Sequence, residues 1–236
     1  MLYCFKHLFL QNNQSQELLA GIGVYNTTVT GDTRFDRVYA TSKAAKKIPM
    51  LDEFCLNSTV IVAGSTWPRD EELLLEITPL LQQDVKLIIA PHEINSARID
   101  ELINRFGLPC ARYTTPNQNN LSDARILFID TIGILASAYG HGHIAYVGGG
   151  FGAGIHNTLE PATFGMPIIF GPNYAKFREA KELITHSAAF SINNPNKLKE
   201  TLNLMLDKNL RHKAGSAAKR YVEQNIGATQ VILSKL

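Results

Sequence analysis

A glycine-rich stretch carries the clearest chemical signal in the sequence, GGGFGAGIHNTLEPATFG at residues 148–165. Five of its first seven residues are glycines, which lack a Cβ atom and so let main-chain N–H groups approach an anion. A His, an Asn, a Glu and a Pro follow, and then a pattern typical of a helix begins. Glycine-rich loops before helices bind phosphate, because the first N–H groups of the helix point toward the ligand. The stretch therefore predicts a site for a phosphate compound.

The role of Glu160 depends on where that helix begins. If Asn157 is the N-cap, Glu160 falls at the third helical position and could form half of a capping box, which is a structural role. If Thr158 is the N-cap, Glu160 can face a ligand, and its carboxylate could accept two hydrogen bonds from ribose hydroxyls. We expect the second role, because five glycines are more than a helix cap requires.

Three other loops follow predicted strands and carry polar, proline or glycine residues. In VAGSTWPRDEE, Ser65 and Thr66 could hold a phosphate or carboxylate, although helix capping explains them as well. In IIAPHEINSARI, Pro91 fixes the backbone at the strand end and His92 follows directly. In IDTIGILASAY, Gly133 would let a flat ligand such as a base approach the backbone, but a simple strand–helix turn explains it equally.

The glycine run also matches the G-x-G-x-x-G/A fingerprint of dinucleotide-binding sites, over residues 148–153. That fingerprint requires an acid about 20 residues further on, at the end of the next strand. The next strand here, MPIIFGPN, ends in Gly171 and Pro172, so the sequence argues against NAD. No DxD-like metal motif lies at a strand end, and we expect neither a metal nor a cofactor.

Composition excludes several classes of protein. The chain has 236 residues, 45% hydrophobic and 19% charged, and its formal net charge of +2 is too small to favour nucleic acid. Cys4, Cys55 and Cys110 are far apart, which argues against a disulfide framework or a zinc site. No apolar run approaches the roughly 20 residues that a membrane span needs. We therefore expect a soluble globular chain.

Strand-like and helix-like patterns alternate along the chain. Continuous apolar runs predict strands buried on both faces at 3–10, 27–30, 59–63, 85–90, 109–113, 126–129, 144–148, 167–170 and 188–192. Helical patterns are clearest at 71–81, 94–106, 176–185 and 196–206, with one or two further helices over 209–234. This order predicts an α/β fold, a Rossmann-like parallel sheet with helices on both faces. Such sheets bind ligands at the carboxyl ends of their strands, where the four loops lie.

The pattern divides the chain into three parts. Residues 1–40 hold two short strands and a helix over 15–21, which is too little for a domain, and we interpret them as the end of an earlier domain. Residues 41–57 are predicted to be a linker, and their lysines, Lys43, Lys46 and Lys47, could lie near anionic phospholipid, although a solvated cluster explains them better. Residues 58–236 form the ligand-binding domain and its C-terminal helices.

Four segments together resemble the C-terminal half of 3-deoxy-D-manno-oct-2-ulosonic acid (Kdo) transferases, which are GT-B glycosyltransferases. These segments are VTGDTRFDRV (29–38), VAGSTWPRDEE (62–72), IAPHE (89–93) and YVGGGFGAGIHNTLEPATFGMPIIFGPNYAKFREAKEL (146–183). The resemblance implies two Rossmann-like domains facing a cleft, with the CMP part of the donor on the C-terminal domain. It implies transfer of Kdo from CMP-Kdo to the lipid A precursor in lipopolysaccharide biosynthesis, on the cytoplasmic side of the inner membrane of Gram-negative bacteria.

Carried over by motif, the resemblance also implies which residues contact the donor. Ile134 stands where many members of the family carry an acid, so contacts to the base in that loop would come from the backbone. Ala90 likewise stands in a loop where many members carry an arginine before the histidine. The implied contacts are Pro91, His92, Ile132, Gly133, Ile134, Asn157, Thr158, Leu159 and Glu160, with Ser65, Thr66 and Gly150 as further candidates near the phosphate or sugar.

In this family the general base and the acceptor site lie in the N-terminal domain, of which residues 1–40 would be the last strands. We therefore expect this chain to be a fragment that binds CMP or CMP-Kdo, lacks the catalytic base and is inactive alone. The lipid A precursor and the inner-membrane surface would be partners of the full-length protein. Two alternatives stay open: another GT-B enzyme, such as a UDP-sugar transferase or epimerase, and a noncatalytic nucleotide-binding module.

Overall fold

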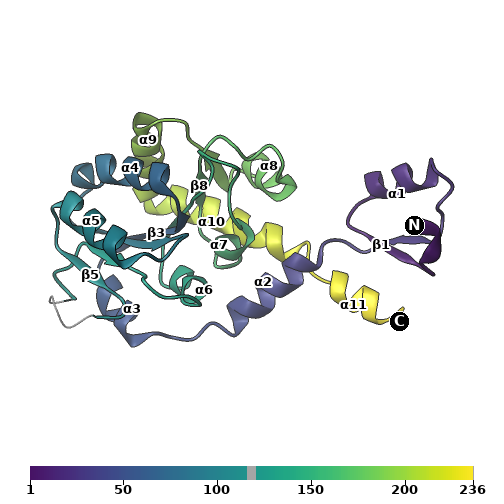
Figure 1. Ribbon diagram of the computed structural model, residues 1–236, viewed down its shortest axis with the longest axis horizontal. Coiled ribbons are helices and arrows are strands. Elements are labelled where there is room, and N and C mark those ends of the chain that lie inside the picture. The colour runs from purple at the N-terminus through teal and green to yellow at the C-terminus, as the bar shows by residue number, and fades with distance from the viewer. Residues whose placement is uncertain (116–120, 236) are drawn as a thin grey trace.

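The computed structural model describes residues 1–115 and 121–235, and Figure 1 shows its arrangement. Within these residues a seven-stranded parallel sheet forms the centre of the larger part of the molecule, in the order β5-β6-β4-β3-β7-β8-β9. The parallel sheet confirms the fold class predicted from the alternating pattern. Its strands are β3 (Thr59–Thr66), β4 (Val85–Pro91), β5 (Cys110–Arg112), β6 (Ile126–Phe128), β7 (Ile144–Val147), β8 (Ile168–Phe170) and β9 (Ala189–Ser191).

Helices cover both faces of the sheet, because neighbouring residues of each strand point to opposite sides. Val60 and Val62 of β3 lie in one core, and Ile61 and Ala63 lie in the other. The first core also holds side chains of α2 (Thr33–Lys43), α3 (Pro49–Cys55), α6 (Leu135–Tyr139), α7 (Leu159–Thr163), α8 (Arg178–Thr185) and α10 (Lys208–Glu223). The second holds side chains of α4 (Pro68–Ile77), α5 (Ser96–Phe106) and α9 (Pro195–Leu206). This double coverage explains why the strands are continuous apolar runs in the sequence.

The sheet has a switch point between β3 and β7. The chain passes from β3 to its neighbour β4 and builds β5 and β6 on that side, and then it adds β7, β8 and β9 on the other side of β3. Gly64 of β3 pairs with Val147 of β7 at the end of their ladder. The loops that follow these two strands therefore start side by side and run in different directions. Crevices that bind ligands in open α/β sheets form at this kind of position.

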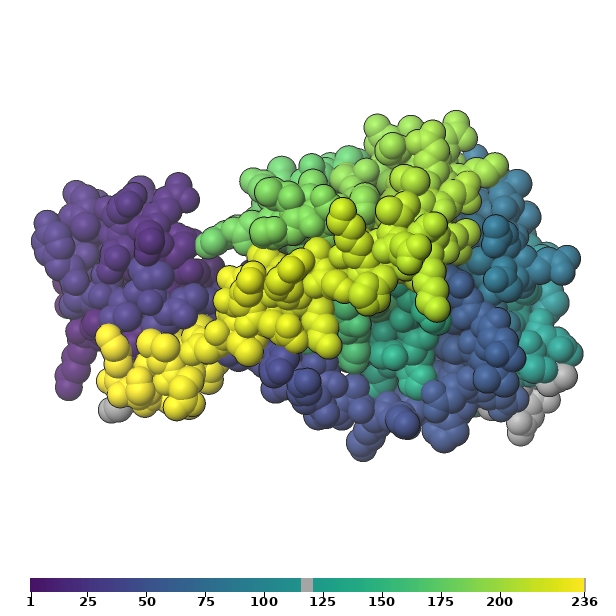
Figure 2. All heavy atoms as spheres, turned by 180° about the vertical axis from the view of Figure 1, so that it is seen from behind, coloured from purple at the N-terminus to yellow at the C-terminus, as the bar shows by residue number. Residues whose placement is uncertain are grey.

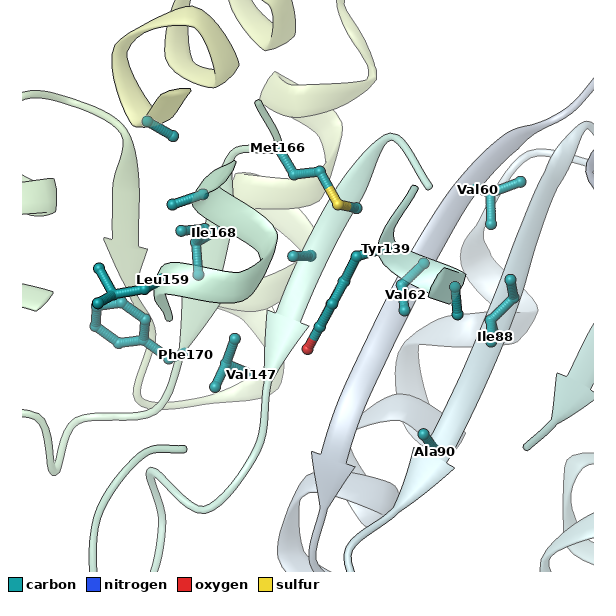
Figure 3. Packing of buried hydrophobic residues seen from close by; sticks show 14 of the residues in the cluster. Val60, Val62, Ile88, Ala90, Tyr139, Val147, Leu159, Met166, Ile168 and Phe170 are labelled. Atoms are coloured by element: carbon teal, nitrogen blue, oxygen red, sulfur yellow. The ribbon is translucent and has the colours of Figure 1, made fainter. Parts of the chain in front are cut away.

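Tyr139 fills the first core beside this switch point (Figure 3). Its side chain is almost fully buried, and its hydroxyl lies so close to Gly64 that a Cβ atom at Gly64 would be 2.1 Å away. Burial raises the pKa of Tyr139, and the charge of Glu160 raises it further, so the hydroxyl stays protonated. The apolar core thus extends to the carboxyl ends of the strands and comes close to Glu160.

Residues 1–32 form a small lobe beside the main body (Figures 1 and 2). After a short 3-10 turn (Leu2–Cys4), β1 (Leu8–Leu10) pairs in parallel with β2 (Thr27–Val29), and α1 (Asn13–Ala20) connects them. All of residues 1–32 are described, and Val24 is the one hydrophobic residue among them that is buried. The C-terminal helix α11 (Ala228–Leu233) lies against this lobe, next to it in Figure 2. The lobe therefore has almost no core of its own.

The structure differs from the predicted linker at residues 41–57. Helix α2 begins after its N-cap Asp32, which accepts a hydrogen bond from the Arg34 N–H, and it runs past the predicted boundary at residue 40 to Lys43. Helix α3 follows and buries Leu51 and Phe54 completely in the first core. Burying one such side chain contributes about 1.5–3 kcal/mol, so this segment is part of the packed body. Each of these short helices buries only two hydrophobic side chains. In a segment that also carries three lysines, two apolar residues are too few to predict a helix.

None of the described helices is both long enough and apolar enough to cross a bilayer.

Asp36 of α2 connects the main body to the start of the C-terminal helix α11. Its carboxylate accepts hydrogen bonds from the Gly227 N–H at 2.5 Å and from the Thr229 N–H and hydroxyl at 2.8 Å. Burial raises the pKa of Asp36, but these hydrogen bonds outweigh burial and lower it below its ordinary value. Asp36→Ala should reduce the free energy of unfolding by about 1 kcal/mol, the usual cost of losing a helix N-cap.

Amide hydrogen exchange over residues 227–233 measures this effect locally. We expect faster exchange there in Asp36→Ala, and a smaller increase in Thr229→Val, which keeps two of the three hydrogen bonds. Equal exchange in Asp36→Ala and in the unaltered chain would contradict the role of Asp36.

Candidate functional site

The glycine loop after β7 is closely packed. A Cβ atom at Gly148 would lie 2.2 Å from the Ser65 carbonyl oxygen, and one at Gly150 would lie 2.6 Å from Gly171 main-chain atoms. Gly149 has φ of +90°, and its carbonyl accepts hydrogen bonds from two later N–H groups of the loop, so the loop closes on itself. Gly148 and Gly150 therefore serve close packing, where we expected a loop that offers its N–H groups to an anion.

Asp70 connects the loops that follow β3 and β7. Its carboxylate is fully buried, and Oδ1 accepts a hydrogen bond from the Tyr146 hydroxyl at 2.7 Å. Oδ2 accepts from the main-chain N–H groups of Trp67 and Gly149, both at 2.9 Å. The contact with Trp67 is the capping contact expected for an acid in the first turn of a helix. The contacts with Tyr146 and Gly149 join residues more than 70 positions apart, and local sequence rules cannot predict them.

Trp67, His92 and His156 form an aromatic cluster over these loops. The Trp67 ring stacks on His92 with centroids 4.5 Å apart, and the rings of His92 and His156 lie 4.4 Å apart. The Trp67 indole Nε1 donates a hydrogen bond to His156 Nε2 at 2.9 Å, which requires the imidazole nitrogen to be unprotonated. Burial lowers the pKa of His156, and the neighbouring His92 lowers it further. Our sequence prediction included His92 but not the other two.

A cavity of about 450 Å³ opens between the two loops, within the range of roughly 300–1,000 Å³ typical of small-molecule sites. It lies beside the switch point of the sheet and beside the aromatic cluster, and Arg69 gives it a positive charge. Its lining residues are Trp67, Pro68, Arg69, Asp70, Gly149, Phe151, Gly152, Ala153, Gly154 and His156.

The start of α7 answers the question about Glu160. Thr158 is the N-cap, while the Asn157 side chain accepts a hydrogen bond from the Leu159 N–H and donates one to Glu160 Oε1, both at 3.0 Å. Glu160 therefore forms no capping box with the Asn157 backbone. Its second oxygen, Oε2, accepts no hydrogen bond from a described residue, and the buried Thr158 hydroxyl has no partner in the described part of the chain. Two side-chain oxygens at this helix start thus have no hydrogen-bond partner among the described residues.

At the ends of β3 and β4, the side chains of the predicted contact residues mainly contact other parts of the protein. The Thr66 hydroxyl is buried and donates a hydrogen bond to Glu71, which in turn pairs with Arg98. Ser65 has φ of +53° at an irregularity of the β3–β4 ladder. Pro91 is buried at the end of β4.

The loop between β6 and α6 is open to solvent. Ile132 is 89% exposed, and no atom lies within 4 Å of the position that a Cβ would take on Gly133. Ile134 packs partly against the first core. Gly133 and Ile134 line a second hollow of about 610 Å³, together with Tyr113 and the Lys46–Lys47 pair.

The structure brings the predicted donor contacts to one edge of the sheet, since they follow β3, β4, β6 and β7, but not into one cavity. Leu159 is fully buried, so only its backbone could meet a ligand. Gly150 is buried against Gly171. The roles of these residues in donor binding remain predictions. The described residues contain no group of three or more His, Cys, Asp or Glu side chains arranged to hold a metal ion.

No protein-family model matches this chain. Among curated proteins, it is 30% identical over 214 residues to a 3-deoxy-D-manno-octulosonic acid transferase of Rickettsia prowazekii (strain Madrid E). The alignment covers 87% of this chain and 45% of that protein. The chain spans about half the length of the curated relatives it matches first.

Solved structures with a similar fold include the C-terminal CMP-Kdo binding domain of WaaA from Acinetobacter baumannii, with a TM-score of 0.66 and 23% identity. That match covers 78% of this chain and 98% of the domain. The UDP co-structure of MnaA from S. aureus has a TM-score of 0.64 at 15% identity, covering 98% of this chain and 62% of that one. These likenesses confirm the GT-B fold that the sequence predicted.

The packing of the glycine loop predicts which of its glycines tolerate a side chain. Gly148→Ala should lower the free energy of unfolding by about 1–3 kcal/mol, because its Cβ would overlap the Ser65 carbonyl. Gly152→Ala is the matched control, since the nearest atom would be 3.7 Å away, and should change stability by less than about 0.5 kcal/mol. Urea unfolding measures both, and equal losses would contradict the packing role.

The hydrogen bond between Trp67 and His156 predicts a pH-dependent fluorescence signal, since Trp67 is the one tryptophan in the sequence. Protonation of His156 removes the acceptor, so emission should change with a midpoint below the ordinary value of 6.5. The unfolded chain then binds this proton more readily than the folded chain. The contribution of His156 to the free energy of unfolding is therefore present above its unfolded pKa of about 6.5. It is lost as the pH falls from there through the lower pKa of the folded chain.

Two variants separate the histidines in that titration. His156→Gln should abolish the transition, whereas His92→Gln should keep it and move the midpoint upward, because His92 lowers the pKa of His156. A transition that survives in His156→Gln would contradict the assignment.

Proposed function

The chain is related to the 3-deoxy-D-manno-octulosonic acid (Kdo) transferases, and on that premise we propose that it is the donor-binding part of such an enzyme. In this proposal it holds CMP-Kdo at the carboxyl ends of its parallel strands. The reaction is transfer of Kdo to the lipid A precursor, in lipopolysaccharide biosynthesis at the inner membrane.

The observation that carries this proposal is the arrangement at the start of α7. Glu160 Oε2 and the Thr158 hydroxyl lack partners among the described residues, in the segment whose sequence most resembles the family. A carboxylate oxygen there can accept hydrogen bonds from ribose hydroxyls. Asn157 keeps the Glu160 side chain in place through its amide. The site thus combines a fixed carboxylate acceptor with an unpartnered hydroxyl among the described residues.

Other predicted contacts support the same ligand. Gly133 leaves its backbone uncovered, so a planar base could reach main-chain groups of the loop without a side chain in between. His92 follows β4, across the switch point from α7, and its ring is part of the aromatic cluster. A nucleotide-sugar that spans these loops would lie along the carboxyl edge of the sheet, as in other open α/β folds.

The proposed chemistry is a direct displacement at the anomeric carbon of Kdo. The bond from that carbon to the CMP phosphate oxygen breaks with its electron pair leaving on the phosphate, and a bond to the acceptor oxygen forms. A general base takes the proton of the acceptor hydroxyl. Main-chain dipoles near the start of α7 would stabilise the charge on the leaving phosphate. We assign the base and the acceptor site to the half of the relatives that this chain does not match, so the 236-residue chain by itself binds donor and transfers nothing.

Nucleotide preference tests the proposal. Saturating CMP should raise the thermal unfolding temperature by mass action, and should do so more than UDP. Glu160→Ala should weaken CMP binding by about 1–3 kcal/mol, the range for lost hydrogen bonds to a charged group. Glu200→Ala, an exposed carboxylate on α9, is the control and should bind CMP as the unaltered chain does.

Three results would contradict parts of the proposal. Greater stabilisation by UDP would favour a UDP-sugar enzyme. Unchanged CMP affinity in Glu160→Ala would favour a noncatalytic module with another nucleotide site. Kdo transfer by the purified chain would overturn the assignment of the base to another part of the protein.

A further inference from the structure

We propose that the cavity between the loops after β3 and β7 takes the glycosyl part of the donor, and that Asp70 is the positioning residue that holds its walls. This inference rests on the proposed function, because it assumes a nucleotide at the start of α7. It adds a subsite and a residue that the sequence motifs did not indicate.

The position of the cavity argues for the glycosyl part. His156 forms one of its walls, and two residues later the chain reaches Thr158, the N-cap of α7. A nucleotide bound at Glu160 would therefore present its leaving-group end toward His156 and the cavity. Arg69 on the cavity wall can pair with the carboxylate of an acidic sugar, and Trp67 offers an apolar surface for its ring.

Asp70 fixes the two sides of this cavity from behind. Of the three hydrogen bonds it accepts, two come from main-chain N–H groups on opposite walls, those of Trp67 and Gly149. Both residues line the cavity, and Trp67 also carries the contact with His156. The carboxylate is fully buried, so its effect on a ligand would come from holding these two loops in position. Moving either N–H group would move a wall.

A purely structural role for Asp70 is the competing explanation. Tyr146 is buried in the second core, and its hydroxyl needs an acceptor. Tyr146→Phe removes that hydrogen bond and leaves both cavity walls attached to Asp70. Asp70→Asn is the conservative change, since its amide oxygen can face the two N–H groups while its NH₂ faces Tyr146, whose hydroxyl then accepts. Asp70→Ala releases all three donors.

Fluorescence of Trp67 provides the measurement, because this single tryptophan stands in the cavity wall. Each of the three variants is titrated with CMP and with CMP-Kdo, and thermal unfolding shows that it is folded. The unaltered chain should bind CMP-Kdo more tightly than CMP. Asp70→Ala should lose about tenfold or more in CMP-Kdo affinity, as expected for displaced positioning groups. Its CMP affinity, and both affinities of Asp70→Asn and Tyr146→Phe, should stay within about threefold of the unaltered chain.

Each other outcome has a defined meaning. Equal affinity of the unaltered chain for CMP and CMP-Kdo overturns the glycosyl subsite and leaves nucleotide binding intact. Unchanged CMP-Kdo affinity in Asp70→Ala, or an equal loss in Tyr146→Phe, overturns the positioning role. If the unaltered chain binds neither ligand, the proposed function fails, and acrylamide quenching of ligand-free Trp67 decides the positioning role. Quenching should then increase in Asp70→Ala and not in Tyr146→Phe, and no increase overturns the role.

If Asp70→Ala does not fold, Asp70→Ser takes its place in the experiment. The same changes in CMP and CMP-Kdo affinity are then expected of Asp70→Ser. Its shorter side chain fills part of the space but cannot reach both N–H groups at their present distances of 2.9 Å.

Discussion

The close approach of two main-chain segments, one leaving β3 and one leaving β7, is the constraint on which the site depends. The Gly148 N–H donates to the Gly64 carbonyl, and the Ser65 carbonyl lies where a side chain on Gly148 would be. At this distance the two loops cannot both carry bulky residues, so one of them is nearly all glycine. The cavity, the aromatic cluster and the start of α7 follow within a few residues of this contact.

A buried carboxylate in the wall of the candidate site needs a physical explanation. An unpaired charge in an apolar interior costs several kcal/mol, and Asp70 avoids this cost with three donors, two of them main-chain groups. These N–H groups are thereby occupied and cannot contact a ligand. For the donor that we propose, positive charge would come from Arg69 at the cavity and from the main chain at the start of α7. The close packing of Gly148 and Gly150 therefore shapes the walls of the candidate site.

The sheet could be predicted from sequence because its strands are buried on both faces and so are continuous apolar runs. The edge at which the candidate site lies followed from the same argument, since the four candidate loops come after strands. Contacts such as Asp70 with Tyr146 depend on the register of β3 against β7, which local patterns do not encode. Trp67 and His156 were missed for the same reason, because they meet only when two loops fold together. Helices α2 and α3 were not predicted, because each buries only two hydrophobic side chains and so shows too weak a helical pattern of apolar residues.

The meeting of the two chain ends has a mechanical consequence. The described segment begins in the small lobe and finishes in α11 beside it, and Lys235 Nζ lies 3.0 Å from the Thr28 hydroxyl. A force applied to the two ends would therefore load the contact between α11 and the lobe before it reached the parallel sheet. The contact between Lys235 and Thr28 would carry that load first, because the bonds from Asp36 of α2 to Gly227 and Thr229 tie α11 to the main body and not to the lobe. The lobe would detach while the main body stayed folded, since the lobe has little core to hold it.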